Sequence, residues 1–304
     1  NLSNKHTENN SSYHHCDAHM FEIYQQKALY DAIDDGGKED LFKFKSSFAE
    51  FDFLAFSKSV QCFAFLINNQ PSNLTYLNIL PCVHALTTFS ERIFYLSQTF
   101  LSSHNLTTQK TVSHMNRDPN NYSKIPDLKQ LEIHTNILLE LMFSLFCHSS
   151  IVLINYVKSQ NLQILTNQET TSLLWHSCWS HLLKRIVVFV IDFRRHIRLS
   201  CMHFIERALR IRDIQVMPMI EWFACFQRIL LPMLKLLITN SPPINISELD
   251  ETKTRSLALV SKLFLQNLSE ISKHQCFSEL WKTILDIIGK YHSSKSTDVL
   301  QEAL

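Results

Sequence analysis

The stretch from residue 181 to residue 211 constrains the fold most, because it carries two apolar stripes separated by a very short polar turn. Apolar residues recur three or four positions apart in each half, and this spacing puts each set on one face of a helix. The sets are Leu182, Ile186, Phe189 and Val190 in the first half, and Ile197, Cys201, Phe204, Ile205 and Ala208 in the second. The stretch therefore predicts two amphipathic helices that form a hairpin.

The turn between the two stripes holds Asp192 and, six residues later, Arg198. An Asp at a helix start can accept hydrogen bonds from the free amides of the first turn, so we expect Asp192 to cap the second helix. Arg198 points elsewhere and could reach the Asp of a stacked neighbour. A long apolar helix, an Asp-bearing turn and a second helix that begins with Ile-Arg are typical of a HEAT-type repeat, so we assign Asp192 and Arg198 to a structural repeat turn.

Glycine is scarce, with only three residues in 304, whereas strands and tight turns need more of it. The first helices of successive pairs are expected near residues 173, 219 and 276, at intervals of 46 and 57 residues. The first interval fits a repeat of about 40–47 residues, and the second fits only if 240–250 is a loop insertion. We predict an all-α fold, a HEAT/armadillo-like α-solenoid of stacked helix pairs with long concave surfaces for partners.

The chain divides into four parts by composition. Residues 1–37 are predicted to be mostly disordered, and residues 38–101 form a helical block. Residues 102–127 are rich in Ser, Thr, Asn and His and are predicted to be a disordered insertion or linker. Residues 128–304 carry the HEAT-like repeats. Because the chain starts without Met and ends in what resembles an unfinished helix, we expect a fragment of a longer protein.

The charge balance argues against a nucleic acid partner, and the hydropathy pattern argues against a transmembrane span. Lys plus Arg number 29 and Asp plus Glu number 28, so the net charge of +1 predicts no nucleic acid partner. The most apolar run, 137–157, contains Glu140, His148 and Asn155 and is amphipathic, so we interpret it as a core helix and predict no transmembrane span. No signal peptide opens the sequence.

No constellation for nucleophilic or acid–base catalysis is recognisable, and we predict no enzyme activity, no cofactor and no metal. His14, His15, Cys16 and His19 are metal-binding residue types, but they form one short cluster without a partner cluster, which favours an incidental polar tail. The eight cysteines are scattered without a Cys-x-x-Cys pair, which favours reduced, buried thiols over a disulfide framework.

Basic residues cluster between positions 184 and 212, where eight bases meet two acids. One interpretation is a solvated face combined with structural Arg–Asp pairs between repeats. The other is a site for anionic lipid headgroups or an acidic partner, since each base near an anionic membrane contributes about 1 kcal/mol. The candidate residues for that patch are Lys184, Arg185, Arg194, Arg195, Arg207 and Arg210; Arg198 and Arg212 complete the cluster.

Several segments carry a family likeness. They are Trp222-Phe-x-Cys225-Phe226, Glu251-Thr252-x-x-Arg255, Leu280-Trp281-x-Thr283 and, more weakly, Cys82-Val83-His84-Ala85-Leu86. These segments resemble the C-terminal region, downstream of the Sec7 domain, of the large Golgi-type Arf guanine-nucleotide exchange factors (the brefeldin-A-resistance, or GBF and GNOM, group). The likeness covers roughly residues 40–101 and 130–304.

The resemblance implies a role for the parent protein rather than a reaction for this chain. Members of the family activate Arf GTPases at the Golgi through a glutamate in a Phe-Arg-Leu-Pro-Gly-Glu-Ala-Gln loop of the Sec7 domain. None of the three glycines here is followed by Glu, so that loop is not in this sequence. The resemblance therefore implies a regulatory and membrane-targeting region, cytoplasmic and peripheral on Golgi membranes.

The implied partners are anionic lipids of the Golgi membrane, other domains of the parent exchange factor, and the Arf GTPase through the parent. Two other classes stay open at this point. One is a generic HEAT-repeat adaptor that binds proteins without Arf involvement, and the other is an enzyme whose site is not recognisable from the sequence.

Overall fold

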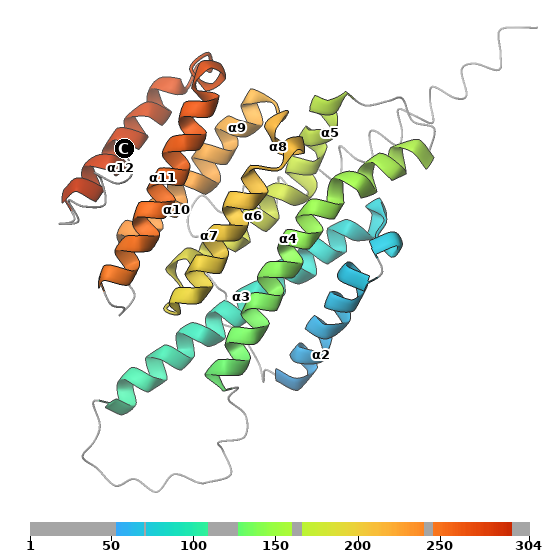
Figure 1. The fold of residues 1–304 in the computed structure, drawn as a ribbon, viewed down its shortest axis with the longest axis vertical. Helices are drawn as coiled ribbons and strands as arrows, with labels where there is room; N and C mark the ends of the chain where they lie inside the picture. The colour runs from blue at the N-terminus through green and yellow to red at the C-terminus, as the bar shows by residue number, and fades with distance from the viewer. Residues whose placement is uncertain (1–52, 70, 109–126, 160–165, 240–245, 294–304) are drawn as a thin grey trace, which may run out of the picture.

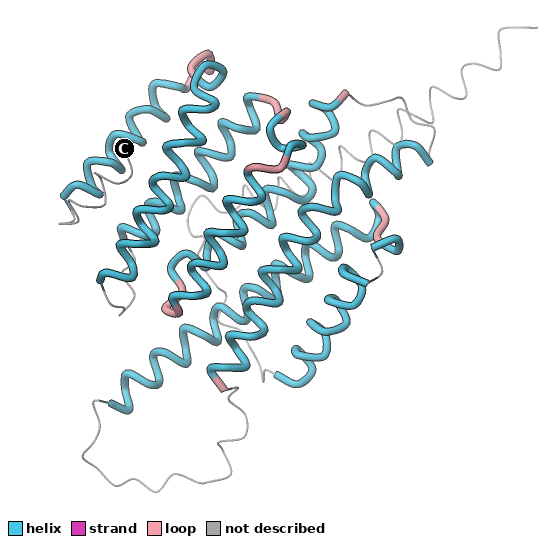
Figure 2. The backbone as a smooth tube through the Cα atoms, viewed as in Figure 1, coloured by secondary structure: helices cyan, strands magenta, loops and turns pink. Residues whose placement is uncertain are grey.

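The computed structural model describes residues 53–69, 71–108, 127–159, 166–239 and 246–293 (Figure 1). Within these ranges the regular structure is helical and no strand occurs, which confirms the all-α prediction (Figure 2). The expectations for residues 1–37, including the His14 to His19 cluster, lie outside the described residues, as do residues 109–126 of the predicted linker.

Long helices joined by short turns make up the fold, with π-helical (η1, η4, η6) and 3₁₀ (η2, η5) segments at some junctions. The first elements are α2 (Phe53–Ala64), η1 (Phe65–Asn69), η2 (Pro71–Asn73), α3 (Tyr76–Thr108) and α4 (Leu128–Ser159). The middle elements are α5 (Asn167–Leu174), η4 (Trp175–Trp179), α6 (Ser180–Val188), η5 (Phe189–Ile191), α7 (Arg195–Leu209) and α8 (Arg212–Gln215). The last are α9 (Met219–Cys225), η6 (Phe226–Leu230), α10 (Leu231–Thr239), α11 (Ile246–Ile271) and α12 (Phe277–Ser293).

The helices form two layers. In one layer α2, α4, α7 and α11 pack side by side in that order, and in the other α3 contacts α6, α6 contacts η6, and α10 contacts α12 (Figure 1). Consecutive helices α3–α4, α6–α7 and α10–α11 pack against each other across the layers. The predicted α-solenoid of stacked helix pairs is therefore confirmed.

Equivalent helices of the second and third pairs share an irregularity. The run from Asn167 to Ile191 and the run from Met219 to Thr239 are each interrupted by one π-helical turn, η4 and η6. Each π turn adds one residue to the local repeat, which the 3.6-residue periodicity of the sequence does not reveal. Because both turns fall near the same distance from the start of their runs, the two runs correspond as first helices of successive units.

The repeat intervals are longer and more even than predicted. The first helices begin at Asn167, Met219 and Phe277, so the intervals are 52 and 58 residues rather than 46 and 57. The earlier start at Asn167 has a local cause, a capping box. The Thr166 hydroxyl accepts from the Glu169 amide, and the Glu169 carboxylate accepts from the Thr166 amide.

The boundary predicted after residue 101 is wrong, because α3 continues through Thr108, seven residues into the predicted linker. Pro81 lies inside α3. A proline there removes one backbone hydrogen bond from a helix of 33 residues, and the surrounding packing of α3 on α4 and α6 holds the helix together.

Two helical runs, 128–159 and 219–239, are long and apolar enough to cross a membrane by length and composition. In each, 61% of the most apolar window is buried against the rest of the fold. Burial of this kind is what a core helix of a helical bundle shows, in agreement with the interpretation of 137–157 as a core helix.

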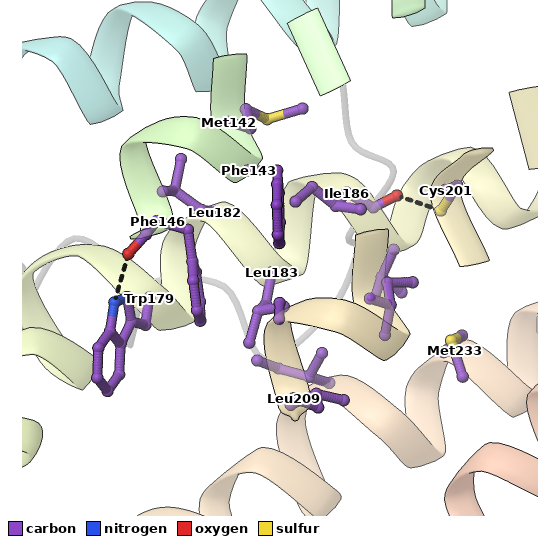
Figure 3. Close-up of a cluster of buried hydrophobic side chains, with 14 of the residues drawn as sticks. Met142, Phe143, Phe146, Trp179, Leu182, Leu183, Ile186, Cys201, Leu209 and Met233 are labelled. Carbon is purple, nitrogen blue, oxygen red and sulfur yellow. Dashed lines mark hydrogen bonds between the residues drawn. The ribbon is translucent and has the colours of Figure 1, made fainter. Parts of the chain in front are cut away.

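The core is continuous across the units, and Figure 3 shows part of it between α4, η4, α6 and α7. The Phe146 and Trp179 rings stack with centroids 5.2 Å apart, and the Trp179 indole donates to the Phe146 carbonyl oxygen at 3.1 Å. The Cys201 thiol donates to the Ile186 carbonyl oxygen at 2.8 Å. The seven cysteines among the described residues are free thiols.

Candidate functional site: the turn between α6 and α7

Asp192 lies in the turn between η5 and α7, and its side chain is fully buried. Its Oδ1 accepts from the backbone amide and from Nε of Arg194, each at 2.9 Å, and its Oδ2 accepts from Nη2 of Arg194 at 2.8 Å. The predicted N-cap role of Asp192 is therefore wrong. Helix α7 begins at Arg195, the N-cap position is Arg194, and that residue makes no side-chain cap.

Arg194 connects the turn to the preceding unit. Its Nη2 donates to the Ser97 hydroxyl of α3 at 3.1 Å and to the Thr135 hydroxyl of α4 at 3.2 Å. Each hydroxyl donates in turn to a carbonyl oxygen of its own helix, Ser97 to Ile93 and Thr135 to Leu131. A buried arginine needs both a counter-charge and hydrogen-bond acceptors. The turn and the two helices supply them for Nε and Nη2, whereas Nη1 is buried without a hydrogen-bond partner among the described residues.

Arg198 connects the same turn to the following unit. Its Nη1 donates to the backbone oxygens of Asp192 at 2.8 Å and Phe193 at 3.0 Å. Its Nε lies 3.3 Å from the Thr252 hydroxyl, and its Nη2 lies 3.3 Å from a Glu248 carboxylate oxygen, both on α11. Burial lowers the pKa of Arg198, and the hydrogen bond and charge of Glu248 act against that shift. From the sequence, Arg198 could reach an Asp of a stacked neighbour; in the structure its acidic partner is Glu248.

The remaining basic residues do not gather in one patch. Arg185 pairs with Glu91 of α3, Arg195 with Glu251 of α11 at 2.7 Å, and Arg210 with Glu206 at 2.6 Å. The Arg207 guanidinium lies over the Phe143 ring, 4.4 Å from its centroid. Arg194 is buried, so its place in a lipid-facing patch is wrong, and Lys184 is half-buried on α6.

A second polar contact between units was not predicted. The buried carboxylate of Glu221 on α9 accepts from the Ser172 hydroxyl at 2.7 Å and lies 2.9 Å from Nε2 of His176. No periodicity in the sequence links His176 to a residue 45 positions away. This contact joins the first helices of the second and third units.

These polar groups hold helices together, and the described residues assemble no group of three or more metal-ligating side chains. A small cleft of about 180 Å³ lies between η6, α10 and α12, lined by Phe223, Leu231, Lys235 and Leu280 among others. Its volume is below the roughly 300–1,000 Å³ of typical ligand pockets. The polar arrangement of the described residues is that of an inter-unit clamp, which we define as Asp192, Arg194 and Arg198 with their partners Ser97, Thr135, Glu248 and Thr252.

Comparison with known proteins identifies the second half of the chain. Residues 160–304 match the family described as the GBF1-like tetratricopeptide repeat region. The GBF1-like region contains α5 to α12 and both arginines of the inter-unit clamp, whereas Ser97 and Thr135 lie outside it. The family is described by tetratricopeptide rather than HEAT repeats, so the confirmed architecture is an α-solenoid of helix pairs.

The curated relatives are guanine-nucleotide exchange factors by name, and the two plant relatives are named as ARF exchange factors. The chain is 26% identical over 180 residues to the Golgi-specific brefeldin A-resistance guanine nucleotide exchange factor 1 homolog of Caenorhabditis elegans, covering 59% of this chain and 9% of that protein. It is 29% identical over 121 residues to the ARF guanine-nucleotide exchange factor GNL1 of Arabidopsis thaliana, covering 38% and 8%. It is 26% identical over 132 residues to GNOM of the same plant, covering 41% and 9%.

The chain thus spans less than a tenth of the length of these relatives. No solved structure matches it. The resemblance to a region of the Golgi-type Arf exchange factors outside the Sec7 domain is confirmed by the GBF1-like match and by these relatives.

Proposed function

We propose that this chain is a non-catalytic, regulatory and membrane-targeting helical-repeat region of an Arf guanine-nucleotide exchange factor that acts in Golgi vesicle trafficking. The observation that carries the proposal is the match of residues 160–304 to the GBF1-like region. The nucleotide exchange itself belongs to a Sec7 domain elsewhere in the parent protein. The partners are the other domains of the parent, Arf through the parent, and the cytoplasmic face of the Golgi membrane.

The inter-unit clamp supports a scaffold role. Arg194 reaches both helices of the preceding unit, and Arg198 reaches α11 of the following unit, so one turn ties three units together. Solenoid units normally contact only their neighbours, and their relative orientation sets the curvature of the binding surface. A clamp of buried arginines fixes that orientation, which suits a region that positions other domains.

Direct contact with lipids would be made by the outer edge of the stack rather than by the turn between η5 and α7. Arg207, Arg210 and Arg212 are exposed at the end of α7 and the start of α8, with Glu206 and Asp213 beside them. Three bases offset by two acids give a weak attraction to anionic lipids that salt screens over about 8–10 Å. Peripheral attachment through this edge would therefore need support from the rest of the parent protein.

The exchange role is tested by measuring nucleotide release from Arf with the 304-residue chain and with the complete parent protein. The chain alone should leave release at its uncatalysed rate, whereas the parent should accelerate it. A fluorescent fusion of the complete parent protein should concentrate at the Golgi, and it should do so less when this region is deleted. Acceleration by the chain alone would contradict a non-catalytic role, and a parent gene without a Sec7 domain would favour the generic adaptor.

A further inference from the structure

Arg207 differs from the other exposed arginines at the end of α7. Its guanidinium lies over the Phe143 ring of α4, 4.4 Å from the ring centroid, and it forms no ion pair with any described residue. Arg210, three residues later, pairs with Glu206 at 2.6 Å. Arg212 also forms no ion pair within the described ranges, but no aromatic ring there holds its guanidinium. Arg207 therefore combines a fixed position with a charge that is available to a ligand.

The ring under Arg207 is itself held in place between two helices. Phe143 is 9% exposed, and its ring packs against Phe204 of α7 with centroids 5.3 Å apart. Helices α4 and α7 lie side by side in one layer, so this pair of rings fixes the position of the guanidinium on the outer face of the layer (Figure 1). The planar fork of an arginine matches two oxygens of a phosphate, and a guanidinium held by a ring loses less conformational freedom on binding.

The surroundings of Arg207 are polar on α7 and apolar on α4. His203, one turn before Arg207, is exposed. On α4, Cys147 and Ile151 follow Phe143 at intervals of four residues, and Ile151 is 58% exposed. Burial raises the pKa of the Cys147 thiol and the charge of Arg207 opposes that rise, so Cys147 also lies near the guanidinium. A cation beside exposed apolar side chains suits the boundary between lipid headgroups and acyl chains.

We propose that Arg207, held over Phe143, binds the headgroup phosphate of an anionic phospholipid, with Ile151 beside it at the membrane surface. This inference rests on the membrane-targeting role proposed above and assigns that role to one residue. A guanidinium and a phosphate are complementary in charge and in geometry. A lipid needs only this one contact, whereas a stable protein interface buries about 1,200–2,000 Å². A single contact also agrees with the weak attraction of an edge where acids offset bases.

Co-sedimentation of the 304-residue chain with phosphatidylcholine vesicles, with and without phosphatidic acid, tests the proposal at low salt. The native chain should bind the vesicles that contain phosphatidic acid. Arg207→Lys keeps the charge but loses the planar fork, so it should weaken this binding several-fold. Phe143→Leu should weaken it by about two- to fivefold, which corresponds to the contribution of a cation–π contact at an exposed arginine.

Arg210→Lys is the matched control, because it makes the same change at a guanidinium that already pairs with Glu206, and it should bind like the native chain. Far-UV circular dichroism and the urea midpoint show that each variant is folded. Equal binding by the native chain, Arg207→Lys and Arg210→Lys would overturn the proposal.

Two further results would also overturn the lipid contact. Displacement by inorganic phosphate, beyond the effect of chloride at equal ionic strength, would assign the site to a soluble phosphate. Failure of the native chain to sediment with phosphatidic acid vesicles would leave the site to an acidic protein partner. The proposed targeting role fails separately: a parent protein that reaches the Golgi equally well without this region would refute that role, whereas the binding difference between Arg207→Lys and Arg210→Lys would still support the contact.

Discussion

Nη1 of Arg198 lies 2.8 Å from the backbone carbonyl oxygen of Asp192, so these two residues meet through the main chain rather than through their charges. The Asp192 carboxylate is occupied by Arg194 instead. One short turn therefore uses two arginines in different directions. Arg194 carries the ion pair and points to α3 and α4, and Arg198 satisfies the turn's carbonyl groups and points to α11.

Arg198→Met should lower the free energy of unfolding by about 2–3 kcal/mol. Methionine keeps the apolar stem but leaves the buried carbonyl oxygens of Asp192 and Phe193 without their donor, and hydrogen bonds to charged groups contribute about 1.5–3 kcal/mol. The Glu248 side chain is 38% exposed, so its ion pair adds little. Urea unfolding followed by far-UV circular dichroism measures the change.

Arg195→Met is the control for that measurement, because it removes an arginine from the same helix turn that is exposed and pairs with the partly exposed Glu251. Exposed ion pairs contribute about 0–1 kcal/mol, so this variant should be nearly as stable as the native chain. Equal losses for Arg198→Met and Arg195→Met would show that Arg198 is not part of a clamp.

Asp192→Asn should be more damaging, with a loss of about 3 kcal/mol or more. The substitution keeps the shape of the side chain but leaves the buried Arg194 guanidinium without its counter-charge, and breaking a buried ion pair costs about 3–5 kcal/mol. The double variant Asp192→Asn with Arg194→Met should lose less than the sum of the two single variants. A double-mutant cycle by urea unfolding tests this, and strictly additive losses would contradict coupling between the two residues.

Sequence patterns were sufficient for the helices and for the place of this turn, because apolar residues at spacings of three and four report one buried face. They were not sufficient for the role of Asp192. Its backbone is extended, with φ −60° and ψ 141°, and α7 begins only at Arg195, so the carboxylate is too early to cap the helix. A sequence places an N-cap from residue type, and the turn's geometry decides which amide the side chain meets.

The excess of basic residues counted along residues 184–212 overstated the exposed positive charge, for a physical reason. The count included bases and acids of one segment, whereas the counter-charges Glu91, Glu248 and Glu251 come from α3 and α11. Neutralisation across stacked helices is a property of the fold, and no local window contains it. Two arginines of the basic cluster are buried, and Arg185 and Arg195 pair with carboxylates of other helices.

Binding to anionic vesicles should depend on the outer edge of α7. Arg207→Glu with Arg210→Glu should abolish co-sedimentation with vesicles that carry acidic lipids, because it turns the local balance of three bases and two acids into one base and four acids. The control is Lys282→Glu with Lys290→Glu, which makes the same change of charge at exposed positions on α12. Binding of the native chain should fall as salt rises. Equal effects of the two double variants would rule out a localised lipid contact.

The α-solenoid should lose stability at alkaline pH because of its buried thiols and phenols. Burial raises the pKa of Cys178 from 9.0 to about 12, against the opposing effect of the Ser149 hydrogen bond, and burial together with Tyr156 raises the pKa of Tyr76 from 10.0 to about 12. In the unfolded chain these groups ionise at their usual values. Their contribution to stability is therefore fully present below pH 9 and is lost as pH rises towards 12, by up to about 1.4 kcal/mol per pH unit for each group.

The urea midpoint measured from pH 8 to pH 11 should fall, and it should fall less steeply in Cys178→Ala than in Cys62→Ala, whose thiol is exposed. The slopes are compared rather than the absolute midpoints, because Cys178→Ala also removes core volume at every pH. A Cys178→Ala slope that equals that of the native chain would show that the pKa of this thiol is the same in the folded and the unfolded state.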